Sequence, residues 1–551
     1  MAYFTIQQGR FFNSYDISEK EKQKLDDFLE ILEESGVGKI IESETERDYS
    51  KGGRLGTNPY RLFATIIYSF SQHSGSVRKI EECIKFDLRY IYLMEQKQVS
   101  YVTISKFLNN VVVKNHRKLY SCIIKTIIKK YEINTNDVFL DGTKLEANAN
   151  KYKFVWKPIY FHKKLNESIR NILIRYFELP PSKILFTSKE VATYLNELRT
   201  KIEKANIEIC SGKGHRQLPI VKDFNILSKL LIKVLEYEEK EEICGPNRNS
   251  YFKTDRDATA MCLKEDYYSG LGSNMHAAYS LQIIVSKGII LDYYVSQDRS
   301  DSNTLIPTLD TYYKDYLCFP KRLCADSAYG SFSNYEYLEK NGIENYVKFS
   351  MWQKMIEGSF VPLFSFDDEN RFKCLNGNYG TPIALGRHPK ERESMFYLIK
   401  GCQKCPIKDY CMKTLKDKTK DERVFEASYK AFMYRKIATN NLLSPKGIEM
   451  RINRSSQVEG TFGIIKQNME YDRIRRRGLD KVTTEISLVC LGLVVRKLFT
   501  LIDGKAKMDY WIAPDGLLSE YPKPYSMKKL LKIATKGKNE TMRKSYRKKG
   551  R

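Results

Sequence analysis

The first part of the chain places apolar residues at helical spacing. Ser18 precedes a charged run over residues 19–34, in which Phe28, Leu29 and Leu32 fall on one side. The same kind of pattern, or a plain apolar run, covers residues 62–70, 76–93, 102–113 and 119–128. These runs predict a compact helical module over residues 1–130.

From residue 131 onward the pattern changes to short apolar runs that predict strands. One run ends in Asp141 (residues 137–141) and another ends in Asp326 (residues 322–326). Residues 278–285 and 289–295 flank a Lys-Gly pair and predict a β-hairpin. Helices are expected over residues 304–316, with Asp301 or Ser302 near the N-cap, and 333–341, and a further strand over 345–349. This alternation predicts an α/β fold with a sheet of mixed strand directions.

Other stretches interrupt or extend this core. The first part of the core is expected to span residues 131–350. Lys- and Glu-rich helical patterns predict exposed helices inserted within it, at about residues 160–250. Residues 351–440 are irregular, aromatic and cysteine-bearing. A strong helix is predicted over residues 448–478, within a last core part, 441–510, and a basic tail over 511–551.

Composition narrows the class of protein. A hydrophobic fraction of 42% in 551 residues excludes a wholly disordered chain, and 30 Gly with 16 Pro exclude collagen-like sequence. The 93 Lys and Arg residues against 67 Asp and Glu give a net charge of +26. Such a charge favours a polyanionic partner, with nucleic acid the first candidate, although an ordinary solvated surface is the alternative.

The sequence also bears on compartment. The N-terminus has no secretion signal, and the apolar run at residues 486–495 is too short to span a bilayer. Cysteines scattered singly along a long chain are typical of buried thiols in a reducing compartment. We therefore expect a cytoplasmic, nucleoid-associated protein with no membrane partner.

Three carboxylates carry the main chemical hypothesis. If the strands ending in Asp141 and Asp326 are parallel neighbours, both side chains reach one edge of the sheet. Adjacent carboxylates repel each other, so both stay ionised only beside cations, and Mg²⁺ or Mn²⁺ suits oxygen ligands. Glu459, on the predicted late helix, is the third candidate. The alternative is that each Asp is a turn or cap residue.

The segment around Glu459 has a recognisable pattern. Val458, Ile465 and Met469 form an apolar stripe at helical spacing, with Glu459 and Lys466 beside it. A basic run follows at once and would present cations to phosphates: Arg473, Arg475, Arg476 and Arg477. The alternatives are a surface ion pair and an ordinary charged helix end.

Four cysteines cluster late in the chain. Cys402 and Cys405 form a Cys-x-x-Cys pair, Cys411 follows, and Cys374 precedes them. Four thiolates at such spacing can make a tetrahedral structural Zn²⁺ site, and reduced thiols without metal are the alternative. A redox role is less favoured because no thioredoxin-like context surrounds the pair.

Taken in order, several motifs resemble one family. They are Ser76–Cys83, Asp141-Gly-Thr-Lys-Leu-Glu-Ala-Asn-Ala-Asn150, Thr254–Thr259 with Lys264-Glu-Asp266, Tyr294–Gln297, Ala325-Asp-Ser-Ala-Tyr-Gly330 and Gln457–Lys466. Over roughly residues 50–500 the chain resembles bacterial insertion-sequence transposases of the DDE class, of the IS1182 type within the IS4-like group.

The resemblance implies an RNase H-like core whose acidic triad is Asp141, Asp326 and Glu459, and a cysteine-rich insertion between the second Asp and the Glu. It also implies an N-terminal module that handles transposon ends. The group carries a Tyr-Arg-Glu-Lys signature, and Glu459 and Lys466 keep its spacing, so that Lys466 would contact phosphate. Arg454 lies five residues before Glu459 instead of four, and Ile452 replaces the Tyr, so no role is carried over to either.

Together these features predict a DNA transposase that cuts transposon ends and joins them to target DNA by two-metal-ion phosphoryl transfer. We expect a homodimer or larger assembly on DNA. The alternatives are a non-catalytic DNA-binding protein derived from a transposase, and an RNase H-like nuclease without strand transfer.

Overall fold

The computed structural model describes residues 17–45, 56–72, 75–209, 217–263, 274–384, 393–413, 419–469, 471–505 and 510–521, without the side chains of residues 159–161. The basic tail after residue 521 and the Lys264-Glu-Asp266 motif lie outside the described residues.

The N-terminal part is helical, as predicted. Ser18 caps the first helix by accepting a hydrogen bond from the Glu21 N–H. The run predicted as one helix over residues 76–93 is two helices, because Asp87 ends the first and its carboxylate accepts from the Arg89 N–H to cap the second. The helices are α2 (Glu19–Glu34), α3 (Val37–Thr45), α4 (Pro59–Gln72), α5 (Val77–Phe86), α6 (Leu88–Leu93), α7 (Tyr101–Phe107) and α8 (Val113–Lys130), with a π turn at Leu108–Val112.

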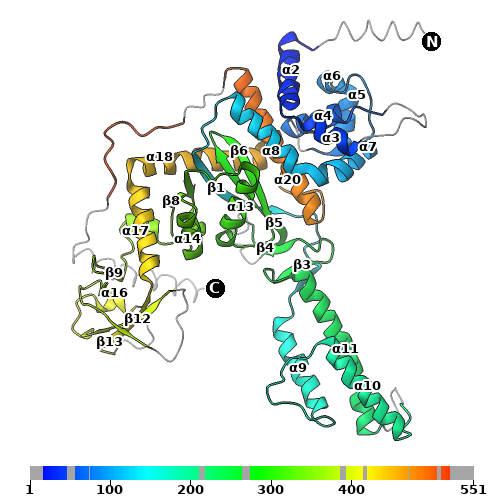
Figure 1. The fold of residues 1–551 in the computed structure, drawn as a ribbon, viewed down its shortest axis with the longest axis vertical. Helices are drawn as coiled ribbons and strands as arrows, with labels where there is room; N and C mark the ends of the chain where they lie inside the picture. The colour runs from blue at the N-terminus through cyan, green and yellow to red at the C-terminus, as the bar shows by residue number, and fades with distance from the viewer. Residues whose placement is uncertain are drawn as a thin grey trace, which may run out of the picture.

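A mixed sheet forms the centre of the molecule (Figure 1), which confirms the α/β class. Its order is β4-β5-β1-β7-β8, and β6 also pairs with β5 in the predicted hairpin. The first strand, β1, is parallel to β7 and antiparallel to β5. The strands are β1 (Asp137–Glu146), β4 (Thr259–Met261), β5 (His276–Ser286), β6 (Ile289–Ser296), β7 (Arg322–Ala325) and β8 (Glu344–Val347).

Helices cover this sheet and join it to the N-terminal part. The helix α20 (Leu479–Ile502) is buried along most of its length and packs against α4, α8 and β6, so the N-terminal helices and the sheet share one hydrophobic core. The other helices are α13 (Leu305–Tyr316), α14 (Phe332–Lys340), α17 (Tyr429–Leu443) and α18 (Pro445–Arg454). The N-cap of α13 is Thr304, and Asp301 and Ser302, predicted near the N-cap, lie in the 3-10 turn directly before it.

Two further units project from the core. One is a helical arm of α9 (Ile159–Leu173), α10 (Ser188–Lys204) and α11 (Pro219–Cys244), joined to the core through the paired strands β2 (Phe154–Trp156) and β3 (Ser250–Phe252) (Figure 1). The other contains the cysteines. It was predicted to be irregular but holds two small sheets around stacked rings such as Phe372 and Tyr397, 4.5 Å apart. Its strands are β9 (Phe364–Phe366), β10 (Phe372–Cys374), β11 (Thr381–Ile383), β12 (Met395–Lys400) and β13 (Glu422–Ala427), with α15 (Trp352–Ile356) and α16 (Lys408–Cys411).

Within the described ranges, no helix has both the length and the apolar character needed to cross a membrane.

A buried charge cluster ties α8 to the sheet. Arg117 on α8 lies 2.8 Å from the fully buried Asp292 of β6 and also contacts Asp315 of α13. Burial raises the pKa of Asp292 to about 7, against the opposing charge of Arg117. Arg117 is therefore the cation that makes a buried carboxylate tolerable at the joint between the helical part and the core.

We expect Arg117→Ala to lower the free energy of unfolding by about 3–5 kcal/mol, because it leaves Asp292 buried without a cation. Urea denaturation would measure the change. Lys130→Ala is the matched control, since Lys130 on the same helix also meets two carboxylates, Glu30 and Glu34, but at the surface. It should cost about 0–1 kcal/mol. Equal losses in both variants would contradict the prediction.

Candidate active site

Two aspartates from distant parts of the chain meet at the centre of the sheet. The parallel pairing of β1 with β7 sets Leu140 opposite Ala325, so Asp141 and Asp326 are the next residues on neighbouring strands. Asp326 follows β7 directly, as predicted, but Asp141 lies in the middle of β1, which continues to Glu146. The prediction that Asp141 ends its strand is wrong, because β1 goes on pairing with β5 beyond the end of β7.

A polar network behind these aspartates fixes the backbone around them. The Gln282 amide nitrogen donates to Ser280 and, at 3.2 Å, to Asp301, while its carbonyl oxygen accepts from the Tyr329 hydroxyl. Gly142 makes room for this amide, since a Cβ there would lie 2.3 Å from the Gln282 nitrogen. Tyr329 belongs to the turn after Asp326, so the network connects the residues next to both aspartates to β5.

Glu459 approaches Asp141 through an arginine. The Arg454 guanidinium donates to Asp141 Oδ2 at 2.9 Å and to Glu459 Oε1 at 3.4 Å, and the Ser455 hydroxyl donates to the other Glu459 oxygen. Residues Ser455–Glu459 form a π turn, in which residues five apart lie on one face. The π turn therefore brings Arg454 beside Glu459 in spite of its one-residue offset from the Tyr-Arg-Glu-Lys signature.

Burial is the largest influence on the pKa of Asp141. Burial raises the pKa of Asp141, and the negative charge of Asp326 adds to this, while Arg454 and the Gly142 N–H oppose it. Glu459 differs, because its side chain is 59% exposed. Lys348, just after β8, senses the same charges, since burial and Arg454 lower its pKa and Asp326 raises it. Another cation near Asp141 and Asp326 would relieve their repulsion.

The helix carrying Glu459 is shorter and less regular than predicted. Val458, Ile465 and Met469 are buried, as the apolar stripe predicted. However, the single helix predicted over residues 448–478 is wrong. After the first π turn come α19 (Gly460–Gly463) and a second π turn, Ile464–Asn468, which contains the half-buried Lys466.

The basic run lies in an extended segment rather than in a helix end. The Ile474 N–H donates to the Glu146 carbonyl, and Arg473 forms a parallel bridge with Glu146, so the run continues alongside the end of β1. Arg473, Arg475 and Arg477 are exposed, Ile474 is buried, and Arg476 is half-buried. We call residues 473–477 the arginine strand.

One buried carboxylate organises this strand. Glu485 on α20 accepts hydrogen bonds from the backbone N–H groups of Arg475 and Arg476 and from the Tyr471 hydroxyl. Asn148, just after β1, donates to the Arg475 carbonyl and accepts from the Arg477 guanidinium. The backbone is thus held from both sides, which leaves alternate arginines facing outward.

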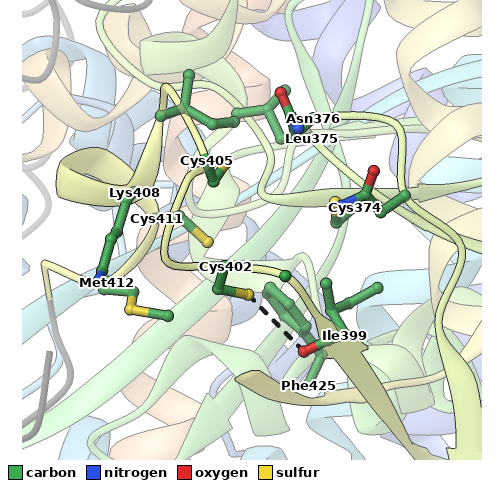
Figure 2. A pocket seen from close by; sticks show the side chains of 13 residues that line it. Cys374, Leu375, Asn376, Ile399, Cys402, Cys405, Lys408, Cys411, Met412 and Phe425 are labelled. Carbon is green, nitrogen blue, oxygen red and sulfur yellow. Dashed lines mark hydrogen bonds between the residues drawn. The ribbon is translucent and has the colours of Figure 1, made fainter. Parts of the chain in front are cut away.

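The four clustered cysteines line one pocket in the unit of small sheets (Figure 2). Burial raises the pKa of Cys402, and the three other thiols raise it further. Arg423 donates to the Cys411 sulfur at 3.1 Å, which opposes the effect of burial on that thiol. The thiols are therefore close enough to influence one another, and Cys411 has a neighbouring cation in Arg423.

Among the residues that the structure describes, no group of three or more His, Cys, Asp or Glu side chains is arranged so that it could hold a metal ion. This applies to the acidic site as to the cysteines.

Two family models match the chain on either side of the strand that bears Asp326. Residues 17–110 match a transposase domain (DUF772), and residues 374–499 match a transposase DDE domain. The chain carries two transposase domains. Their pairing is typical of IS1182-type transposases and confirms the family resemblance. No curated protein and no solved structure matches the chain.

The two domains indicate a DNA transposase. The candidate site residues are distributed unevenly between the matched and unmatched parts of the chain. The second domain contains Glu459, the arginine strand and the cysteines, whereas Asp141 and Asp326 lie between the matched ranges. Sequence reasoning missed three groups of the candidate site: Arg454, Gln282 and Lys348. Only Arg454 had a sequence signal, its nearness to the signature position, and the π turn that restores it cannot be read from spacing.

We expect Gly142→Ala to destabilise the protein by about 1–3 kcal/mol, because the added Cβ displaces the Gln282 amide and leaves its buried partners unpaired. Thermal unfolding would measure this. In a Gln282→Ala background the same glycine change should be nearly neutral, since the clash is gone. Additive losses in the double variant would rule out this coupling.

Proposed function

We propose that this transposase cuts transposon ends and joins them to target DNA by metal-dependent phosphoryl transfer at Asp141, Asp326 and Glu459. The observation that carries the proposal is the placement of Asp141 and Asp326 on neighbouring parallel strands, with Glu459 linked to Asp141 through Arg454. That placement on a mixed sheet also supports an RNase H-like core.

The donor set fits a hard divalent cation. Three carboxylates supply oxygen ligands of the kind that Mg²⁺ and Mn²⁺ prefer. Burial, together with the charge of Asp326, raises the pKa of Asp141, and a bound cation would favour its ionised form. Asp141, Asp326 and Glu459 would hold the metal. A bound pair of ions would stabilise the attacking and leaving oxygens of an in-line displacement.

The chain's own groups would do the rest. The Gln282 network keeps the backbone beside Asp141 and Asp326 fixed, so their carboxylates need little reorganisation during the reaction. Arg454 keeps Asp141 and Glu459 within reach of one guanidinium. The DNA backbone would be bound by Lys466 and by the exposed arginines Arg473, Arg475 and Arg477. The half-buried Arg476 would add a further positive charge to this surface.

We also propose that the protein acts on DNA as a homodimer or larger assembly, because joining requires two transposon ends to be held together. Its place of action would be the nucleoid. The N-terminal helices would handle the transposon ends. A nuclease without strand transfer would give nicked DNA without joined products, and a non-catalytic DNA-binding protein would give neither.

We expect Asp326→Ala to lower cleavage by roughly a thousandfold or more, because the metal's contribution is worth several kcal/mol, while DNA binding persists through lysines and arginines. The measurement is nicking of a supercoiled plasmid carrying the gene's flanking DNA, in Mg²⁺ or Mn²⁺, and its loss on chelation. Asp368→Ala, at an exposed position in the cysteine-bearing unit, is the control. Full cleavage by Asp326→Ala would refute the assignment.

We also propose that Cys374, Cys402, Cys405 and Cys411 hold a structural Zn²⁺. Their shared pocket supports this, as does the donor set, since four thiolates are a common zinc ligand set. Bound zinc would fix the small sheets of residues 364–427 to one another, next to the helix α17 that leads toward Glu459.

We expect the purified protein to contain about one zinc per chain, measured by atomic absorption. The double variant Cys402→Ser, Cys405→Ser should lose it, whereas Cys318→Ser, at an exposed cysteine elsewhere, should keep it. Zinc retained by the double variant would show that these thiols are not its ligands.

A further inference from the structure

An exposed aromatic strand begins at Phe154, five positions along the chain from Ala149, whose carbonyl accepts from Arg473 of the arginine strand. In β2, Phe154 and Trp156 are 47% and 45% exposed, and Tyr152 in the preceding turn is 81% exposed. The rings of Phe154 and Trp156 lie edge to face, 5.7 Å apart, as expected for alternate residues of one strand. The large rings of most aromatic residues are buried, so three exposed rings within five residues need an explanation.

The strand is also an edge. Among the described residues β2 pairs only with β3, with Phe154 opposite Phe252 and Trp156 opposite Ser250. The buried Phe252 packs against Phe154 and fixes the base of that ring. The aromatic pair therefore stands on a firm support while its outer surface stays open.

The surroundings are basic. Residues 147–166 contain five lysines and no Asp or Glu. Lys151 lies over the Tyr152 ring, 5.4 Å from its centroid, and Lys153 is exposed between the rings. Lysines alone could protect an edge strand from aggregation, but they do not account for exposed aromatic rings between them.

This surface continues directly from the arginine strand. Arg473 donates to the Ala149 carbonyl, and Arg477 to that of Asn148. The Asn150 N–H then donates to Thr254 beside β3, which fixes the chain just before the aromatic residues. Tyr152 is three positions after Ala149, so their Cα atoms lie within about 11 Å of each other.

We propose that Tyr152, Phe154 and Trp156 form a stacking surface for unpaired nucleobases of the DNA strand that the arginine strand binds. Aromatic rings interleaved with cations bind single-stranded nucleic acid, because bases stack on the rings while the lysines meet the phosphates. Duplex DNA does not fit, since its bases are covered by their neighbours. The inference rests on the proposed function, because it extends the same DNA-binding surface.

The test compares binding of a blunt DNA duplex with binding of the same duplex carrying an oligodeoxythymidine tail, by fluorescence anisotropy without added Mg²⁺ or Mn²⁺ so that no cleavage occurs. We expect the full-length protein to prefer the tailed duplex. Trp156→Leu should weaken binding of the tailed duplex by roughly fivefold to a hundredfold, the range for one stacked base, with blunt-duplex binding unchanged. Trp156→Tyr should restore the preference, because a ring is present again.

Trp511→Leu is the matched control, since Trp511 is the same residue type at a similar exposure, 39%. It should keep the preference for the tailed duplex. A 2-aminopurine in the tail should lose fluorescence on binding to the wild type and lose less on binding to Trp156→Leu.

The proposal is overturned if the wild type binds both duplexes equally, if Trp156→Leu weakens both by the same factor, or if Trp156→Tyr does not rescue. Plasmid nicking by the wild type separates this inference from the proposed function. Nicking without a tail preference leaves the transposase assignment standing and removes the stacking surface. A tail preference without nicking supports the stacking surface and contradicts the transposase assignment.

Discussion

The parallel pairing of β1 with β7 is the constraint on which the site depends. It sets Asp141 beside Asp326 in a partly buried place, where two carboxylates repel and where water can do little to screen them. Nearby groups oppose this repulsion. Arg454 and the Gly142 N–H donate to Asp141, and Asp326 raises the pKa of Lys348. A divalent cation bound there, as proposed, would reduce the repulsion further.

The irregular helix near Glu459 follows from the same constraint. A regular α-helix would turn residues five apart to different faces, whereas the π turn at Ser455–Glu459 keeps Arg454 and Glu459 together. Gln457 in this turn accepts from the Gly288 N–H at the end of the hairpin, which docks the helix on the sheet. A departure from regular helix geometry thus serves the convergence of side chains from three distant segments.

The proposed DNA-binding surface is positioned by buried polar groups. Glu485, nearly fully buried in α20, holds the backbone of the arginine strand, and the aromatic edge strand begins a few residues beyond the point where that strand meets Asn148. Since α20 also packs against the N-terminal helices, these helices, the sheet and α20 share one continuous core. Positions of charged side chains at the surface are therefore set by that core.

The sequence by itself determined the helical N-terminal part, the hairpin, the strand before Asp326 and the family, because local periodicity and ordered motifs are properties of the chain alone. It also singled out Asp141, Asp326 and Glu459 by context. Only the tertiary structure decided that β1 runs past Asp141, that the arginine run is extended, and that Arg454 reaches two carboxylates. Strand β1 continues because it pairs with β5, and the arginine run is extended because Glu146 and Glu485 bind its backbone. Arg454 reaches Asp141 from 313 positions away along the chain. Such long-range contacts override local preference.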